Sequence, residues 1–215
     1  MGHRPNQSGF TLLELLGVIS ILFVLAVVIL LPRHTVVRTR APRINCVNNQ
    51  KQVALAFKVW ASDHNDKFPM SSSVTNGGTL ELVTSGMTWV HFQVLSNELI
   101  TPRLLICPSD KERIPAKGFS SNLSNTNISY FVGVDADETR PQMFLAGDRN
   151  IIGGALLPNR ILSLTSNDAV RWDNRMHQGQ GNVAFADGSV QQVTSSRLRA
   201  ALLWSGAVSN RLALP

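Results

Sequence analysis

Residues 10–31 read FTLLELLGVISILFVLAVVILL, an uninterrupted apolar run whose single charge is Glu14. As a helix rising 1.5 Å per residue, this run is long enough to cross about 30 Å of hydrocarbon. It exceeds the roughly 7–15 apolar residues of a secretory signal peptide, and no A-x-A-like cleavage site ends it. The sequence therefore predicts a membrane-spanning helix near the N-terminus.

Glu14 needs an explanation, because an ionised carboxylate in a membrane span is costly unless it is paired. One explanation is local. Thr11 would cap the helix, and Glu14, three residues later, would bond back to it in a capping box near the interface.

The residues around Glu14 offer a second explanation. The string SGFTLLE at residues 8–14 resembles the processing site of type IV prepilins and of type II secretion pseudopilins. The resemblance implies cleavage after Gly9 by a prepilin peptidase and N-methylation of Phe10. It also implies that Glu14 neutralises the N-terminal amine of a neighbouring subunit during assembly. These roles are physically reasonable, since a small flexible glycine suits a peptidase cleft and a buried carboxylate needs a cation.

The length and charge of the chain favour one basic globular head on a membrane anchor. The formal net charge is +6 and 44% of the residues are hydrophobic, which fits neither disorder nor a protein with many spans. Four arginines that follow the apolar run favour anionic headgroups: Arg33, Arg38, Arg40 and Arg43. Elsewhere basic and acidic residues alternate, so the pattern does not favour nucleic acid as a partner.

The orientation of the span is open to two interpretations. Only Arg4 precedes the span as a firm positive charge, so a count of flanking arginines would place the head in the cytoplasm. The resemblance implies the reverse, a single-pass inner-membrane protein with its C-terminal head in the periplasm, and we follow the resemblance. The partners that it implies are prepilin peptidase, further copies of the chain, other pilins or pseudopilins, the inner membrane and an assembly platform.

Beyond the span, we expect a stalk helix. Pro32 is expected to end or kink the first helix, and Pro42 to lie in the first turn of a renewed one. An apolar stripe of helical period follows at Cys46, Val53, Phe57 and Trp60. The expected organisation is a leader at residues 1–9, a transmembrane and assembly helix at 10–31, its stalk continuation at 32–66 and a head at 67–215.

The C-terminal part reads as strands and one helix. Residues 129–134 and 143–146 favour strands, and residues 89–95 fit a strand or a short helix. Residues 182–186 and 189–193 predict a hairpin with Asp187 and Gly188 in a two-residue type I′ turn and Phe185 opposite Val190. Ser196 is expected to cap a last helix over residues 197–204. The predicted class is α+β and type IV pilin-like: a long N-terminal helix, half transmembrane and half stalk, packed against a small, mostly antiparallel β-sheet head.

A second resemblance comes from motifs spread along the chain. His177 precedes Asp187 and Gly188 in the pattern H-x9-DG. With the prepilin-like start, this resembles bacterial pilin-like proteins that carry a "processing-associated" H-x9-DG motif. NCVNN at residues 45–49 with Gln52, and CPSD at 107–110, belong to the same resemblance. Two roles stay open for the motif. Asp187 would make the turn with His177 hydrogen-bonded nearby, or the two would bind a metal.

The two cysteines and the acidic residues raise further alternatives. In a periplasmic head, Cys46 and Cys107 could form a disulfide worth about 4 kcal/mol, or stay as two buried thiols. Type II major pseudopilins hold calcium in the head, and the densest acidic cluster here comprises Asp135, Asp137 and Glu138. They are weak calcium candidates, because hard cations take six or more oxygens and no loop pattern is present. We expect an exposed turn there and no cofactor.

The sequence favours a structural protein over an enzyme. It contains no G-x-S-x-G, P-loop, H-E-x-x-H or paired C-x-x-C pattern. We expect a subunit that stacks through its N-terminal helix into a filament, since a heterologous interface that does not close extends indefinitely. The alternatives are a membrane-anchored periplasmic module that binds a solute or DNA without polymerising, and a minor pilin or initiator.

Overall fold

The computed structural model describes residues 9–30, 34–120 and 122–215, with side chains described for 9–29, 42–120 and 122–215. The chain divides into two units, residues 1–40 and 41–215. The expectations placed on Arg4, Pro32 and Arg33 and on the side chains of Arg38 and Arg40 lie outside the described residues.

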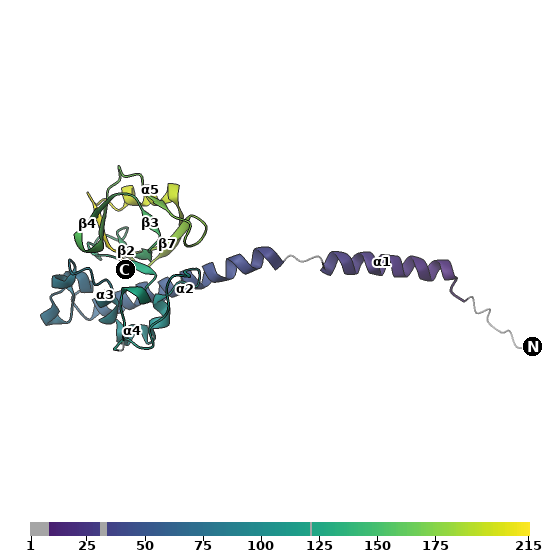
Figure 1. The fold of residues 1–215 in the computed structure, drawn as a ribbon, viewed down its shortest axis with the longest axis horizontal. Coiled ribbons are helices and arrows are strands. Elements are labelled where there is room, and N and C mark those ends of the chain that lie inside the picture. The colour runs from purple at the N-terminus through teal and green to yellow at the C-terminus, as the bar shows by residue number, and fades with distance from the viewer. Residues whose placement is uncertain (1–8, 31–33, 121) are drawn as a thin grey trace, which may run out of the picture. The chain divides into compact units, whose positions relative to one another are not determined.

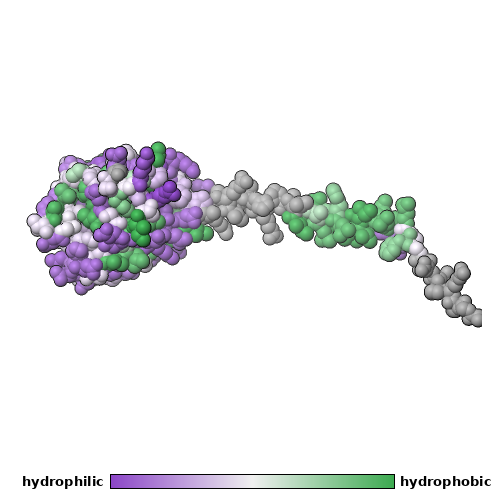
Figure 2. Space-filling view, turned by 90° about the horizontal axis from the view of Figure 1, so that it is seen from below, coloured by the Kyte–Doolittle hydropathy of each residue, from purple (hydrophilic) through white to green (hydrophobic). Residues whose placement is uncertain are grey.

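The first unit contains helix α1 (Leu12–Leu30). Its stretch Leu12–Ile29 is long and apolar enough to cross a membrane, and none of it is buried within the protein. Figure 2 shows α1 as a continuous apolar surface, whereas the surface of the second unit mixes polar and apolar residues. A helix that is apolar all round suits a lipid environment. The predicted N-terminal apolar helix is confirmed.

Helix α2 (His34–Ser62) supplies the predicted stalk residues and carries Pro42 in its interior. The expectation that a new helix begins at Pro42 was wrong, because the helix starts earlier and accommodates a residue that cannot donate its backbone hydrogen bond. The apolar stripe is confirmed: Cys46, Val53, Phe57 and Trp60 are all buried.

Short helical turns follow α2. The longest are α3 (Trp89–Gln93), α4 (Ser96–Leu99) and the 3-10 helix η4 (Pro102–Leu105); the others are η1 (Pro69–Ser71), η2 (Val74–Asn76), η3 (Leu80–Leu82) and η5 (Asn125–Asn127). Of the two readings left open for residues 89–95, the structure shows a helix.

Seven antiparallel strands form the main sheet of the head, in the order β4-β5-β9-β1-β2-β7-β8. They are β1 (Tyr130–Gly133), β2 (Phe144–Asp148), β4 (Ala155–Leu157), β5 (Ile161–Leu164), β7 (Gln180–Phe185), β8 (Val190–Thr194) and β9 (Asn210–Ala213). A separate ribbon pairs β3 (Ile151–Ile152) with β6 (Arg171–Trp172), and the 3-10 helix η6 (Pro158–Arg160) links β4 to β5. The predicted strands at 129–134 and 143–146 are confirmed as β1 and β2.

The sheet packs a hydrophobic core on each face. Along β1, Tyr130 and Val132 join the core shared with α2, whereas Phe131 points into the second core. That second core includes side chains of α5 (Ser195–Trp204), and Figure 1 shows α2 and α5 on opposite sides of the sheet. The alternation follows from the two-residue period of a strand. A long apolar N-terminal helix followed by an antiparallel sheet with helices is an α+β arrangement consistent with a pilin-like fold.

The β7–β8 hairpin is present but its register differs from the prediction. Ala184, not Phe185, lies opposite Val190. The backbone N–H of Phe185 donates to Ser189 O and that of Gly188 donates to Phe185 O, so the connection has three residues, 186–188. Phe185 therefore faces the α5 core while Val190 packs on the α2 core.

The turn chemistry explains the shift. A type I′ turn needs positive φ at both central residues, but in this turn only Gly188, at φ +85°, has it. Asp187 Oδ1 accepts a 2.8 Å hydrogen bond from the backbone N–H of Ser189, which favours a longer turn ending in a left-handed glycine.

The predicted last helix is confirmed as α5, with a different cap. Thr194 Oγ1, not Ser196, accepts the hydrogen bond from the N–H of Arg197. Gly206, at φ +63°, follows the helix and suits its end because glycine adopts this conformation without steric cost.

Candidate functional site

Two parts of the molecule carry the predicted site residues, and the first is the start of α1. Gly9 and Phe10 precede the helix in exposed positions, and Phe10 is 81% exposed. A side chain built at Gly9 would meet nothing within 4 Å. The peptide bond between them is therefore open to an enzyme.

Glu14 forms the capping box that the sequence predicts. Its Oε2 accepts hydrogen bonds from the backbone N–H of Thr11 at 3.0 Å and from Thr11 Oγ1 at 2.9 Å. In return, Thr11 Oγ1 accepts from the N–H of Glu14 at 3.3 Å. The box satisfies helix-end donors and leaves the carboxylate on the surface, so the local role and a role between subunits are compatible.

The second part is a buried polar cluster inside the head. Cys46 of α2, Cys107 after η4, Asp148 at the end of β2 and His177 before β7 bring their ligand atoms within 4.8 Å of one another. Cys107 Sγ lies 3.2 Å from His177 Nε2, and Cys46 Sγ lies 3.3 Å from Asp148 Oδ1. His177 Nε2 is also 3.3 Å from Asp148 Oδ2. Each of the three separated sequence motifs thus contributes one side chain to the cluster: Cys46, Cys107 and His177.

A ring of polar side chains holds the cluster. Gln50 Nε2 donates to Asp148 Oδ1 at 2.7 Å, and the backbone N–H of Asn182 donates to Asp148 Oδ2 at 2.8 Å. The side-chain amide of Asn182 donates to the same oxygen at 2.9 Å and to Cys46 Sγ at 3.5 Å. The Tyr130 hydroxyl lies 3.6 Å from Cys46 Sγ. These bonds fix the direction in which the carboxylate and the thiol point.

Two side chains of α2 also fix the backbone that carries the cluster. Asn49 Nδ2 donates to the carbonyl of Ile106 at 3.0 Å, immediately before Cys107. Arg43 donates to the carbonyl of His177 at 3.4 Å. His177 itself has a positive φ of 50°, a conformation that is uncommon for a side chain of its size.

The CPSD motif has a second buried end. Asp110 accepts from Arg149 Nε at 2.7 Å and from its Nη2 at 3.0 Å. Both side chains are almost fully buried. Cys107, at the start of the CPSD motif, lies near Asp148, and Asp110, at its end, binds Arg149. The motif therefore contacts two consecutive residues at the C-terminal end of β2.

Burial and proximity change the proton affinities in the cluster. Burial raises the pKa of Cys46 well above its usual range and that of Asp148 to about 7. The hydrogen bond from Cys46 lowers the pKa of Cys107 to about 5, against the effect of burial and with help from His177. Burial opposes the charging of His177, but Cys107 and Asp148 raise its pKa. Burial thus favours the neutral forms of Cys46 and Asp148, whereas the contacts of Cys107 favour its thiolate.

The cluster does not have the geometry of a nucleophilic triad. In a triad, the acid orients the histidine through the ring nitrogen that does not face the nucleophile. Here Cys107 and Asp148 approach the same atom, His177 Nε2, and the Cys107 side chain is fully buried. The arrangement points several donor atoms at one spot, as ligands do.

Cys46 and Cys107 are free, buried thiols. The structure brings them together in the cluster, and their pairing as a disulfide stays a prediction. Asp187 lies apart from this contact network. It occupies the exposed β7–β8 turn, and the described hydrogen bonds of His177 go elsewhere.

The acidic residues considered for calcium do not converge. Asp135 binds Arg211, with Oδ1 3.0 Å from Nε. Asp137 accepts two 2.8 Å bonds from Thr139, and Glu138 forms a 2.9 Å ion pair with Lys58. Each of the three carboxylates therefore binds a different protein side chain.

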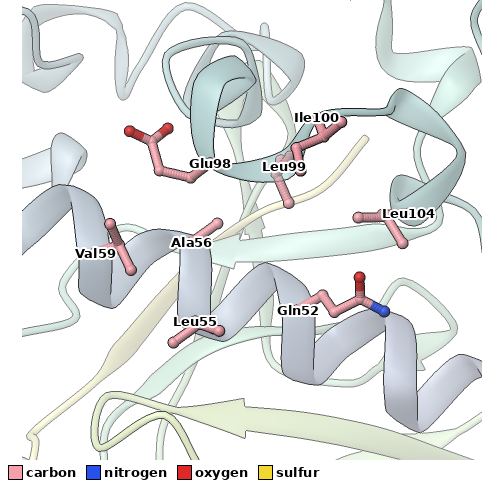
Figure 3. A pocket seen from close by; sticks show the side chains of 8 residues that line it. All are labelled: Gln52, Leu55, Ala56, Val59, Glu98, Leu99, Ile100 and Leu104. Atoms are coloured by element: carbon pink, nitrogen blue, oxygen red, sulfur yellow. The ribbon is translucent and has the colours of Figure 1, made fainter.

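A shallow groove of about 220 Å³ lies between α2 and the segment from α4 to η4 (Figure 3). Its lining is mostly aliphatic, and Glu98 is its only ionisable side chain. Among the described residues, metal-ligating side chains gather only at the Cys46 cluster. That cluster lies in the interior of the head and not in this groove.

Sequence reasoning missed Asp148, Asn182 and Gln50. Gln50 lies within the stalk stripe, one residue after NCVNN, and Asn182 begins the predicted hairpin strand. Asp148 ends a strand whose residues are all buried. An acid at the end of an apolar strand could have indicated a buried polar site, because buried acids need partners.

The comparisons with known proteins concern the N-terminus. Residues 4–30 match the family model described as "Prokaryotic N-terminal methylation motif". No curated protein and no solved structure shows a significant match to the chain. The match supports a prepilin-like, membrane-anchored protein, and it indicates a structural subunit rather than an enzyme.

Proposed function

We propose that this chain is a prepilin-like structural subunit that is cut after Gly9, N-methylated at Phe10 and assembled through α1 into a pilus or a secretion pseudopilus. One observation carries the proposal: the methylation motif at residues 4–30 coincides with an exposed apolar helix that has a single acid in its first turn. The helix serves first as a membrane anchor and then as the packing surface between subunits.

The apolar surface of α1 supports both stages. Its large side chains are between 43% and 83% exposed, so the helix does not bury them within its own unit. Lipid can cover this surface before assembly, and neighbouring helices after it. In the filament, the Glu14 carboxylate would pair with the Phe10 amine of a neighbour, because a charge removed from water needs a compensating charge.

Processing is tested by N-terminal sequencing and mass spectrometry of the membrane-extracted protein. We expect the chain to start at Phe10 and to carry one methyl group on its amine. Gly9→Leu should block the cut, because a peptidase cleft that fits glycine has no room for leucine. Gly17→Leu is the matched control and should be cut normally. A wild-type chain that starts at Met1 would remove the processing step.

Assembly is tested by two substitutions of Glu14. Glu14→Ala removes the charge and the cap, whereas Glu14→Gln keeps an acceptor for Thr11 and removes only the charge. We expect both variants to be cleaved but to give few filaments by electron microscopy. Wild-type filament yield from Glu14→Gln would show that the cap, not the charge, is the role of this residue.

We further propose that the head faces the periplasm. Val208 is 94% exposed, and the two native thiols are buried, so Val208→Cys offers one accessible thiol. A membrane-impermeant maleimide should label it in cells with a permeabilised outer membrane. Labelling that appears only after the inner membrane is lysed would reverse the topology.

A further inference from the structure

We propose that Cys46, Cys107, Asp148 and His177 bind one Zn²⁺ ion inside the head. This site goes beyond the filament role and does not depend on it. The ion would join α2 to the sheet and to two loops, since its four ligands come from four separate segments of the chain.

The spacing of the donor atoms suits a tetrahedral ion. Zinc lies about 2.3 Å from a thiolate sulfur and about 2.0–2.1 Å from an imidazole nitrogen, so its ligands stand roughly 3.3–3.8 Å apart. Three contacts between these side chains measure 3.2, 3.3 and 3.3 Å, and the two that involve Asp148 use its two different oxygens. All the donor atoms lie within 4.8 Å of one another. Small side-chain movements suffice to close this shell around an ion.

The chemistry of the donor set selects the class of ion. Two sulfurs and one imidazole are soft or borderline ligands, which Ca²⁺ and Mg²⁺ avoid and Zn²⁺ prefers. Four protein ligands without an open position are typical of structural zinc rather than catalytic zinc. Complete burial of Cys46, Cys107 and Asp148 agrees with a closed, structural site.

Charge provides an independent reason for a cation. Asp148 is fully buried, and among the described residues no lysine or arginine forms an ion pair with it; the nearby basic side chain is the imidazole of His177. A buried carboxylate next to two thiols is costly without positive charge. A divalent ion supplies that charge at the point where these groups converge.

The surrounding bonds match those of an outer ligand shell. Gln50 and Asn182 orient the Asp148 carboxylate. The Asn182 side-chain nitrogen also lies 3.3 Å from His177 Nε2, so it borders the nitrogen that would bind the ion. Outer contacts of this kind fix ligand direction and tune metal affinity.

A disulfide explains less of the arrangement. A bond between Cys46 and Cys107 would use the two sulfurs and leave the Asp148 carboxylate buried without a cation. It would give no reason for His177 Nε2 to contact both Cys107 and Asp148. A bound ion accounts for all four side chains.

The test uses the full chain, purified in detergent under reducing conditions with added Zn²⁺ and then dialysed. Elemental analysis should find one zinc per chain, and a thiol assay after denaturation with a chelator should find two thiols. Replacing Zn²⁺ with Co²⁺ should give the intense visible bands of a tetrahedral site and the near-ultraviolet bands of thiolate ligation. Chelation should lower the unfolding temperature.

Matched histidine variants separate a ligand from a structural residue. His177→Gln should lose stoichiometric metal, whereas His91→Gln, which alters another buried histidine far along the chain, should keep it. Gln50→Ala should weaken zinc binding by about 10–100-fold, as losses in the outer shell do. Asp148→Asn should shift the Co²⁺ spectrum even where the variant remains folded.

Three results would overturn the proposal. They are the absence of zinc and of cobalt bands in the reduced, folded wild-type chain; a Cys46–Cys107 disulfide in protein isolated without reductant; and full metal content in His177→Gln. None of these readouts depends on cleavage at Gly9 or on filaments, so the site and the proposed function fail separately.

Discussion

Helix α1 and the interior of the head depart from ordinary burial in opposite directions. In α1, large apolar side chains lie on the surface; Leu22 is 58% exposed and Phe23 69%. In the head, polar groups such as Asp148 and Asn182 are completely buried. Exposed apolar surface marks contact with a membrane or a partner, and buried charge marks a compensating ion or pair. Under our two proposals, a membrane or neighbouring subunit covers the first region and a metal ion compensates the second.

The largest expected difference between the regions concerns phenylalanine. Phe57 is fully buried and packs edge-on against Phe68 and Phe92, with ring centroids 6.2 and 5.9 Å away. Phe57→Ala should lower the free energy of unfolding of the head by about 3–5 kcal/mol. Phe23→Ala, the same change in α1, should alter it by less than about 0.5 kcal/mol. Denaturant unfolding in micelles, followed by tryptophan fluorescence, measures both free energies. Equal losses of unfolding free energy in the two variants would contradict the distinction between a buried head core and an exposed α1.

Glycine gives a second matched pair, with a somewhat smaller effect. A Cβ on Gly133 would lie 1.7 Å from the backbone oxygen of Phe144, whereas one on Gly17 would meet nothing within 4 Å. Gly133→Ala should destabilise the head by about 3 kcal/mol, because β1 and β2 must move apart. Gly17→Ala should leave the head unchanged and favour α1 by up to about 1 kcal/mol. Circular dichroism and unfolding of both variants test the pair.

The same comparison explains how much the sequence could predict. The signals of α1 are local: hydropathy, a capping pair and a processing motif all lie within residues 8–31. They were therefore readable without knowledge of the fold. The strands β1 and β2 and the helix α5 were also readable from local patterns.

The buried cluster was harder, because its members come from four segments and only the sheet topology brings them together. Cys46, Cys107 and His177 were each singled out from a motif, but nothing local showed that they meet. The hairpin register failed by one residue, since Asp187 and Gly188 permit two turn lengths. Pro42 suits the first turn of a helix as far as local propensity goes, but local propensity cannot show that α2 begins earlier, at His34.

The stability of the head should depend on pH through the buried side chain of His91, whereas α1 contains no histidine. Burial lowers the pKa of His91 to about 4, and its Nδ1 lies 2.7 Å from Thr79 Oγ1. Unfolding returns this pKa to about 6.5, so the unfolded state binds more protons between these values. Stability should therefore fall as pH drops from about 6.5 to 4, by up to about 3 kcal/mol from this residue.

His91→Gln tests that assignment. The variant should be less stable than the wild type at neutral pH, because the Thr79 contact changes, but its stability should depend less on pH in this window. Unfolding free energies at several pH values between 4 and 7.5 give the comparison. Parallel wild-type and variant curves would assign the acid sensitivity to other groups.

The smallest expected effect compares the helix caps of the two regions. Thr194 Oγ1 accepts from the N–H of Arg197 at 3.3 Å, and Thr11 Oγ1 accepts from the N–H of Glu14 at the same distance. Thr194→Ala should lower the stability of the head by about 1 kcal/mol. Ser196→Ala should cost less, because Ser196 is not the cap, and Thr11→Ala should leave the head unchanged. Equal effects of Thr194→Ala and Thr11→Ala on unfolding of the head would mean that α1 contributes to head stability, and the two regions would no longer be separable.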